Sequence, residues 1–235
     1  MSRFIFNGVS SDDLGLIIRT TPFRPTWTEE TESVTIPGRA CELRQRTGVY
    51  ANSEISVDCV VSDSALFPEI FKALKGKGKL ILSTEPDKYM TAICTLPIPQ
   101  GVAMDMAEMP VSFDCQPFAY KYGEDIETIS SNGTITNGGT LFAEPIITFI
   151  PVNSAVTLTI GDYTTSIDCA MPLSGPFTVT IDVPRKLMYY TNSVGRNISI
   201  LEYTNGVFPV FEIGENAVDC TGADSVNIQM NQRWY

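Results

Sequence analysis

Apolar and polar side chains alternate with period two along much of this chain, and this pattern limits it to a mainly β fold. The run Glu54-Ile55-Ser56-Val57-Asp58-Cys59 shows the alternation most clearly, because its apolar and polar residues fall on opposite faces of an extended strand. Similar runs, separated by Pro, Gly, Asp and Asn, occur at residues 3–6, 16–18, 34–36, 79–82, 89–94 and 109–115. The first half of the chain is therefore predicted to be mainly β.

One segment of the first half has helical periodicity instead. Between Ser62 and Lys75 the large apolar residues recur every three to four positions, as Leu66, Phe67, Ile70, Phe71 and Leu74. Ser and Asp residues before this stripe can cap a helix, and Gly76 after it can end one. We expect an amphipathic helix at about residues 63–75 whose apolar stripe covers a sheet, each buried side chain contributing about 1.5–3 kcal/mol before entropy is subtracted.

The composition changes at about the middle of the chain. Residues 123–140 are polar and rich in turn formers, which suits a link between two domains, and we place the boundary near Asn132. Period-two runs resume at residues 156–160, 179–183, 197–201 and 226–230, without a helical pattern. The prediction is an N-terminal β domain with one helix at residues 1–131 and an all-β antiparallel sandwich at residues 132–235.

Charge and composition exclude several classes of function. The chain has 16 Lys and Arg against 27 Asp and Glu, a formal net charge of -11, so it has no electrostatic support for binding a phosphate backbone without sequence specificity. It contains no His, the most common general base and metal ligand. We therefore predict no specific nucleic-acid binding and none of the hydrolase mechanisms that depend on His.

The six Cys residues and the first residues of the chain indicate the compartment. The cysteines lie far apart, mostly in apolar runs and without CxxC pairs, which is typical of buried reduced thiols. The first residues lack the apolar region and the cleavage site of a signal peptide. No window approaches 18 uninterrupted apolar residues. We expect synthesis that ends in a cytoplasm, with no membrane insertion.

The candidate chemical motifs all favour structural interpretations. Asp12-Asp13 and Glu29-Glu30-x-Glu32 lack the spacing and the glycine of a calcium loop, which favours solvated turn charges. The segment Gly76-Lys77-Gly78-Lys79 follows the predicted helix and precedes a strand, the reverse of a phosphate-binding loop. We assign no catalytic residue, no cofactor and no metal ligand.

Two other functions stay open. Aromatic residues of the second half can form a platform on which sugars stack, as in a carbohydrate-binding module, although core and domain-contact roles are favoured, since β-sandwiches often bury aromatic side chains: Tyr163, Tyr189, Tyr190, Tyr203, Phe208, Phe211, Trp234 and Tyr235. A glycosidase that uses two carboxylic acids needs no His, so the composition does not exclude it.

Several segments, in a fixed order along nearly the whole chain, resemble the distal tail (Dit) proteins of long-tailed bacteriophages. They are residues 4–16, Ile36-Pro37-Gly38-Arg39, residues 78–83 with Asp87-Lys88-Tyr89, residues 113–120, residues 137–140 with 144–147, and Phe208-Pro209 with Gly214-Glu215-Asn216. The order and spacing of these segments agree with the β, helix, β, linker, β layout derived from periodicity.

The resemblance implies a structural protein at the tail tip of a virion, prophage particle or tail-like particle, assembled in the bacterial host cytoplasm. It implies an N-terminal domain that forms a hexameric ring and a C-terminal galectin-like β-sandwich. The partners implied are further copies of the chain, the major tail tube protein, a tail-associated, fibre or tail-lysin protein, and a receptor-binding protein. The second domain, at about 100 residues, has no obvious inserted module.

Two expectations follow from a ring through which a genome passes. A closed ring repeats one heterologous contact, so exposed strand edges can pair with a neighbouring copy. An acidic lining gives the bore a low affinity for DNA, so we expect part of the carboxylates to face the channel. Pro37, Gly38 and Arg39 are the candidate interface residues, with an ordinary turn arginine as the alternative for Arg39.

Overall fold

The computed structural model describes residues 2–95, 97, 99–103, 106–169 and 177–235. The chain divides into two compact units, Met1–Tyr122 together with Tyr235, and Gly123–Trp234. Within the described residues, antiparallel strands make up most of the regular structure and there is a single α-helix. The predicted fold class, mainly β with one helix, is confirmed.

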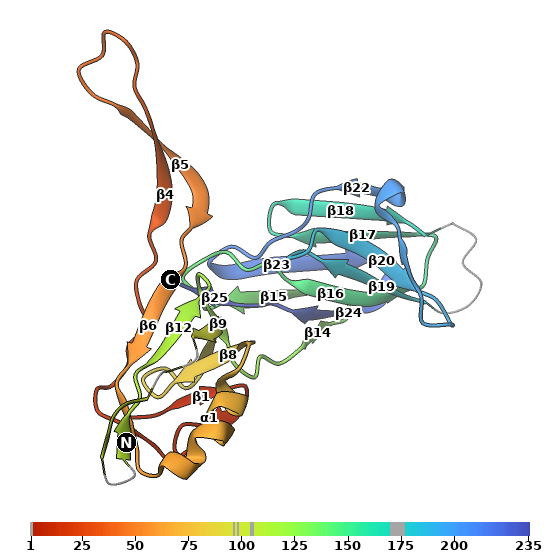
Figure 1. Ribbon diagram of the computed structural model, residues 1–235. Helices are drawn as coiled ribbons and strands as arrows, with labels where there is room; N and C mark the ends of the chain where they lie inside the picture. The colour runs from red at the N-terminus through yellow and green to blue at the C-terminus, as the bar shows by residue number, and fades with distance from the viewer. Residues whose placement is uncertain (1, 96, 98, 104–105, 170–176) are drawn as a thin grey trace. The chain divides into compact units, whose positions relative to one another are not determined.

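The first unit is built on two sheets (Figure 1). The larger one has, in order, β2 (Val9–Ser10), β1 (Phe4–Phe6), β8 (Lys77–Leu82), β9 (Lys88–Thr95), β12 (Val111–Cys115) and β6 (Ser53–Val57), and β13 (Ala119–Lys121) also pairs with β9. The other sheet has the order β10 (Gln100–Ala103), β11 (Met106–Glu108), β7 (Cys59–Val61) and β3 (Leu16–Ile18).

The core of the first unit follows from the alternation in these strands. Phe4 and Phe6 of β1 and Phe113 of β12 have no exposed surface, and the Phe113 ring lies 5.2 Å from the Phe4 ring and 5.4 Å from the Phe6 ring, centroid to centroid. Aromatic pairs at such distances add about 0.5–1.5 kcal/mol to the gain from burial. The strands are therefore fixed in register by one buried face.

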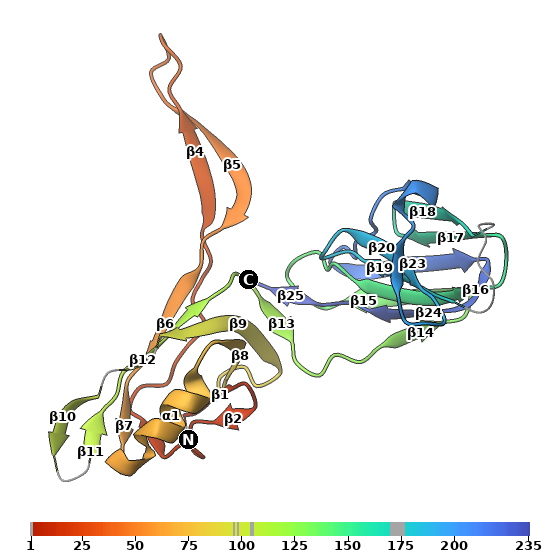
Figure 2. The same cartoon turned by 45° about the vertical axis from the view of Figure 1, so that its right-hand side comes forward.

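The predicted helix is present and begins with a tighter turn. A 3-10 turn, η1 (Ser64–Leu66), leads into α1 (Phe67–Leu74), and the Asp63 carboxylate accepts a hydrogen bond of 2.8 Å from the backbone N–H of Ala65. Ile70 and Leu74 are fully buried, and Figures 1 and 2 both place α1 beside β1. No helix in the described part of the chain is long and apolar enough to cross a membrane.

A third part of the first unit is the hairpin of β4 (Glu29–Val34) and β5 (Leu43–Tyr50). In both views this hairpin extends away from the two sheets of its unit (Figures 1 and 2). It is a two-stranded sheet of its own. The sequence predicted a strand only at residues 34–36.

The second unit is a β-sandwich. One sheet has the order β14 (Glu127–Ile129), β24 (Ala223–Gln229), β16 (Ile146–Pro151), β19 (Thr178–Asp182), β20 (Leu187–Thr191) and β21 (Asn197–Ser199). The other has the order β15 (Asn132–Asn137), β23 (Gly214–Thr221), β17 (Ala155–Ile160), β18 (Tyr163–Asp168) and β22 (Thr204–Gly206). Two short elements, η2 (Leu201–Tyr203) and β25 (Arg233–Trp234), complete the unit.

Alternate residues of both sheets form the core of this sandwich. Ile147 and Phe149 of β16 and Leu158 and Ile160 of β17 belong to one cluster of buried side chains and are at most 2% exposed. Burial of each such side chain stabilises the fold by about 1.5–3 kcal/mol before entropy. The outer faces remain available to solvent or to partners.

The division of the chain into two units falls at a different residue from the predicted boundary. The prediction separated residues 1–131 from 132–235, whereas the second unit begins at Gly123 and Tyr235 belongs to the first unit. The reason is β14, which pairs with β24, about 100 residues later, through Thr128 and Asn227. A pairing across such a sequence distance leaves no local signal in a polar segment.

Candidate functional site

The β4–β5 hairpin is the part of the first unit with the most exposed side chains. Of its strand residues, only Glu29 and Tyr50 are partly buried, and the rest are exposed. The exposed fractions of its large aliphatic residues are 40% for Val34, 39% for Ile36, 44% for Leu43 and 54% for Val49. An isolated two-stranded hairpin is marginally stable in water. The hairpin is therefore the candidate assembly surface.

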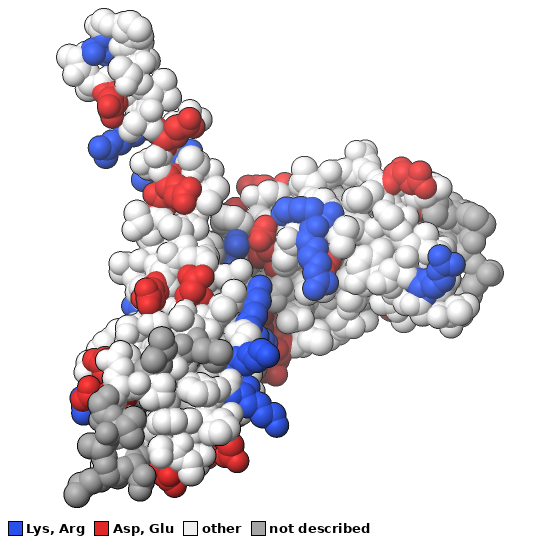
Figure 3. Space-filling model, viewed as in Figure 1, with Lys and Arg blue, Asp and Glu red and all other residues white. Residues whose placement is uncertain are grey.

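The strand register gives the hairpin two different faces. Arg46 lies opposite Thr31 and Arg44 opposite Ser33, whereas Leu43 lies opposite Val34 and Gln45 opposite Glu32. Because side chains alternate along a strand, the arginines share one face, and Leu43, Val34 and Glu32 share the other. Figure 3 shows acidic and basic side chains interspersed along the hairpin. A partner can thus distinguish its faces by charge and by apolar surface.

A small aromatic cluster holds the base of the hairpin. The Tyr50 ring lies 4.9 Å from the Phe118 ring and 6.0 Å from the Tyr235 ring, and the two tyrosine hydroxyls are 3.2 Å apart. The hydrogen bond with Tyr235, together with loss of hydration, raises the pKa of Tyr50 to about 12. Phe118 has a φ of 72°, which is uncommon for a bulky residue, and the two ring contacts help to hold it there.

The candidate interface residues Pro37, Gly38 and Arg39 lie at the tip of this hairpin. All three are exposed, and the backbone N–H of Arg39 donates a hydrogen bond of 3.1 Å to the carbonyl of Ile36. Gly38 has a φ of 84°, which favours glycine at this turn. The resemblance thus identified the turn, whereas periodicity predicted only residues 34–36 as a strand, because β4 and β5 have no buried face.

The acidic motifs do not form a metal site. Within the described residues there is no group of three or more His, Cys, Asp or Glu side chains that could hold a metal ion. Glu29 instead pairs with Arg46 at 3.6 Å and accepts a hydrogen bond from the backbone N–H of Gly48. This carboxylate therefore supports the hairpin.

The six cysteines are free thiols, and five of them are wholly or partly buried. Burial raises the pKa of Cys59, Cys94 and Cys115 to about 12 and also raises that of Cys169 and Cys220. The thiolate is the nucleophilic form, so these side chains are poor nucleophiles near neutral pH. Cys41, in the loop of the hairpin, is exposed.

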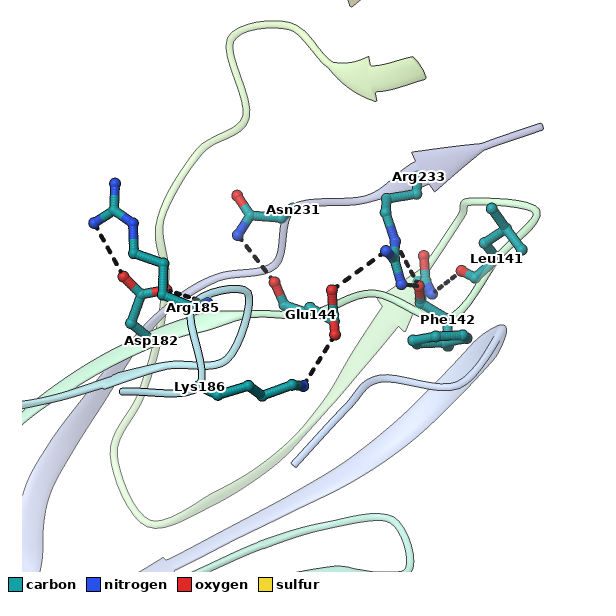
Figure 4. Close-up of polar contacts among 9 residues, drawn as sticks. Leu141, Phe142, Glu144, Asp182, Arg185, Lys186, Asn231 and Arg233 are labelled. Atoms are coloured by element: carbon teal, nitrogen blue, oxygen red, sulfur yellow. Dashed lines mark hydrogen bonds and ion pairs between the residues drawn. The ribbon is translucent and has the colours of Figure 1, made fainter. Parts of the chain in front are cut away.

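The second unit contains a polar network around Arg233 (Figure 4). Arg233 Nε and Nη2 donate hydrogen bonds of 3.0 and 2.8 Å to the carbonyl of Phe142, and Nη1 lies 3.3 Å from a carboxylate oxygen of Glu144. The other Glu144 oxygen lies 3.1 Å from Lys186 Nζ, and Asn231 donates to the Glu144 carbonyl at 2.9 Å. Both oxygens of Glu144 thus face a cation, which suits a structural crosslink better than an acid catalyst.

The aromatic residues of the second half do not form one platform. Phe211 is fully buried, Tyr190 packs edge-on against Phe177, and Tyr163 donates a hydrogen bond to Glu212. Tyr235 belongs to the other unit. These residues therefore serve separate local contacts.

The chain is similar to a known protein in its structure. No protein-family model and no curated protein sequence matches the chain. Among solved structures it is similar to the SPP1 Dit (gp 19.1) protein, described as a paradigm of the hub adsorption apparatus in phages that infect Gram-positive bacteria. The TM-score is 0.74, with 12% sequence identity, over 97% of this chain and 98% of that chain.

The chain has the fold of a phage distal tail protein. The resemblance to Dit proteins that the sequence indicated is thereby confirmed at the level of fold. At 12% identity the likeness concerns the fold alone, and sites and partners have to be argued from the residues of this chain.

Proposed function

We propose that this protein is a structural distal tail, or hub, protein of a long-tailed phage, prophage particle or tail-like particle. Six copies close into a ring that joins the tail tube to the tail-tip or fibre protein and leaves a bore for DNA. The other partners are the tail tube protein, a tail-associated or tail-lysin protein, and a receptor-binding protein. The protein acts at the tail tip of the virion and assembles in the cytoplasm of the bacterial host.

The observation that carries this proposal is the likeness in fold to SPP1 Dit, a hub adsorption protein, over 97% of the chain. A match confined to one domain would leave the role of the other open. The division into one unit with α1 and one all-β sandwich also agrees with a ring-forming domain followed by a galectin-like domain.

The hairpin supports self-association. Its aliphatic side chains are exposed and its two faces differ in charge. In an assembly of identical chains, a neighbouring copy can present the same complementary surface to every hairpin. A contact between different surfaces of identical chains closes into a ring when the rotation allows it. In the proposed ring, each hairpin contacts the next copy, and Pro37, Gly38 and Arg39 at its tip lie in or beside that contact.

The chemistry of the described residues supports a role that depends on shape. The buried cysteines are held as thiols, Glu144 is paired with two cations, and no metal-binding group is present among these residues. We therefore propose that the protein makes and breaks no covalent bond.

Native mass spectrometry and negative-stain electron microscopy of the full chain test this proposal. We expect a species of six times the 25.8 kDa chain mass and rings with a central hole. If rings form only after the tail tube protein of the same particle is added, the proposal also holds. Monomers alone, both with and without that tube protein, would contradict it.

A further inference from the structure

The outer face of the sandwich in the second unit carries a hollow to which the proposed hub function assigns no role. It lies over β16, β19 and β24, which are neighbours in the six-stranded sheet (Figure 1), and has a volume of about 300 Å³. We call it the bulge hollow. The residues that matter for its chemistry are Thr148, Ile150, Thr178, Asp224, Ser225 and Asn227.

A β-bulge creates this hollow. Phe149 of β16 pairs with Val226 of β24, but Pro151 pairs with Ala223, so two residues of β24, Asp224 and Ser225, lie opposite the single residue Ile150. A bulge bends its strand and changes the direction of its side chains, and bulges are enriched next to functional sites. Asp224 and Ser225 both line the hollow.

The polar groups around the hollow are available to a ligand. Among the described residues, the side chains of Thr148, Thr178, Asp224 and Ser225 have no hydrogen-bond partner in the protein, and Asn227 uses only its Oδ1, which accepts from Thr128 at 2.7 Å. Each hydroxyl can donate and accept, the carboxylate accepts, and the Asn227 amide group donates.

Hydroxyls on the outer face of the other sheet behave differently. Thr157 pairs with Ser166 and Thr159 with Thr164, each at an oxygen–oxygen distance of 3.2 Å. Those pairs satisfy each other across neighbouring strands. The unpaired set around the bulge hollow is thus a local property and not a general consequence of threonine on a strand.

Apolar surface completes the hollow. Ile150 and Val152 line it and are 51% and 55% exposed. No Lys or Arg of the described residues lines it, whereas Asp224 does, so an anion would find a like charge there and no counter-charge. The hollow thus disfavours an anion and offers groups that suit a ligand with many hydroxyls and one apolar face.

We propose that the bulge hollow binds one unit of a neutral saccharide. Its volume is at the lower limit of ligand pockets, about 300–1,000 Å³, which suits a single ring. Asp224 accepts charge-assisted hydrogen bonds from two ring hydroxyls, Asn227 and the Thr and Ser hydroxyls bond to others, and Ile150 and Val152 contact the apolar face of the ring. This proposal is independent of ring formation, so a hub protein can fail it and a sugar-binding monomer can pass it.

Saturation-transfer-difference NMR on the full chain tests the proposal, because the signals are read from the sugar and a large assembly does not obscure them. The probes are glucose, galactose, rhamnose and N-acetylglucosamine, with glucuronic acid as the charged comparison. We expect transfer to at least one neutral sugar, with a dissociation constant of about 1 mM or weaker, and less transfer to glucuronic acid.

The Asp224→Ala, Thr178→Val double variant decides whether the transfer comes from this hollow. Both residues are exposed, so the variant keeps the fold, which its circular dichroism and melting temperature check. Affinity should fall at least tenfold in this variant and stay unchanged in Thr164→Val, which removes a paired hydroxyl on the other sheet. No transfer to any of the neutral sugars, or transfer from the folded double variant equal to that from the unaltered chain, would overturn the proposal.

Discussion

The cross-strand pair Val34 and Leu43 offers the sharpest test of the hairpin as an assembly contact. The two residues lie directly opposite each other on the hairpin and are 40% and 44% exposed. The double variant Val34→Thr, Leu43→Thr replaces their exposed apolar surface and keeps a good strand former at each position. Because neither side chain is buried, we expect the free energy of unfolding of the monomer to change by less than about 0.5 kcal/mol.

The expected effect on assembly follows from the area still exposed. Full burial of Val or Leu contributes about 1.5–3 kcal/mol, so burial of the exposed two-fifths contributes about 0.6–1.3 kcal/mol per residue. The pair then contributes about 1–2.5 kcal/mol to each contact between copies. At about 1.4 kcal/mol per tenfold, complete loss of this contribution would raise the dissociation constant of one contact about 5-fold to 60-fold, and threonine, which keeps one methyl group, should raise it by less than that.

Sedimentation velocity over a series of protein concentrations measures this shift. The matched control is Val194→Thr, Ile213→Thr, which removes apolar surface of the same kind from residues of the second unit that are 81% and 61% exposed. The control should assemble like the unaltered chain. Equal assembly of the hairpin variant and the unaltered chain, or equal loss in the control, would refute the assignment of the contact to the hairpin.

Three further predictions concern the two units separately. Asn137, which is 1% exposed, donates to the carbonyls of Leu141 and Phe211 and accepts from the Gly139 N–H, so Asn137→Ala should lower the free energy of unfolding by about 2–4 kcal/mol in urea titrations. Cys41 should be the cysteine that a maleimide modifies fastest at pH 7.5 in dilute protein that has not assembled, whereas all six should react in denaturant; rapid labelling of Cys59, Cys94, Cys115 or Cys220 before denaturation would count against the burial described. The pKa of Tyr50 is raised in the folded state, so its contribution to the free energy of unfolding should be fully present below pH 10 and decrease as the pH rises from 10 towards 12. In the Tyr235→Phe variant, which loses the hydrogen bond between the two hydroxyls, the ultraviolet titration of Tyr50 should move back towards pH 10.

Local periodicity predicted the elements that bury one face. The run at residues 54–59 lies across β6 and β7, and the stripe ending at Leu74 became η1 and α1. In both cases the buried residues recur at the period of the element itself. Such patterns depend on one buried face and need no knowledge of the partner strand.

Elements without a buried face escaped prediction. The β4–β5 hairpin has exposed residues on both faces, so its carboxylates were interpreted as turn charges and only residues 34–36 as a strand. Asn132-Gly133 and Asn205-Gly206 have the residue types of a turn, but they lie in β15 and β22, where pairing with distant strands decides the conformation. The bulge opposite Ile150 likewise depends on the register between β16 and β24.

Cryo-electron microscopy of the intact particle that carries this protein tests the central claim most directly. The account predicts six copies of the chain in a ring at the distal end of the tail, between the tube and the tip protein, with each hairpin against the next copy. A position elsewhere in the particle, or an arrangement that does not close around the tail axis, would contradict it.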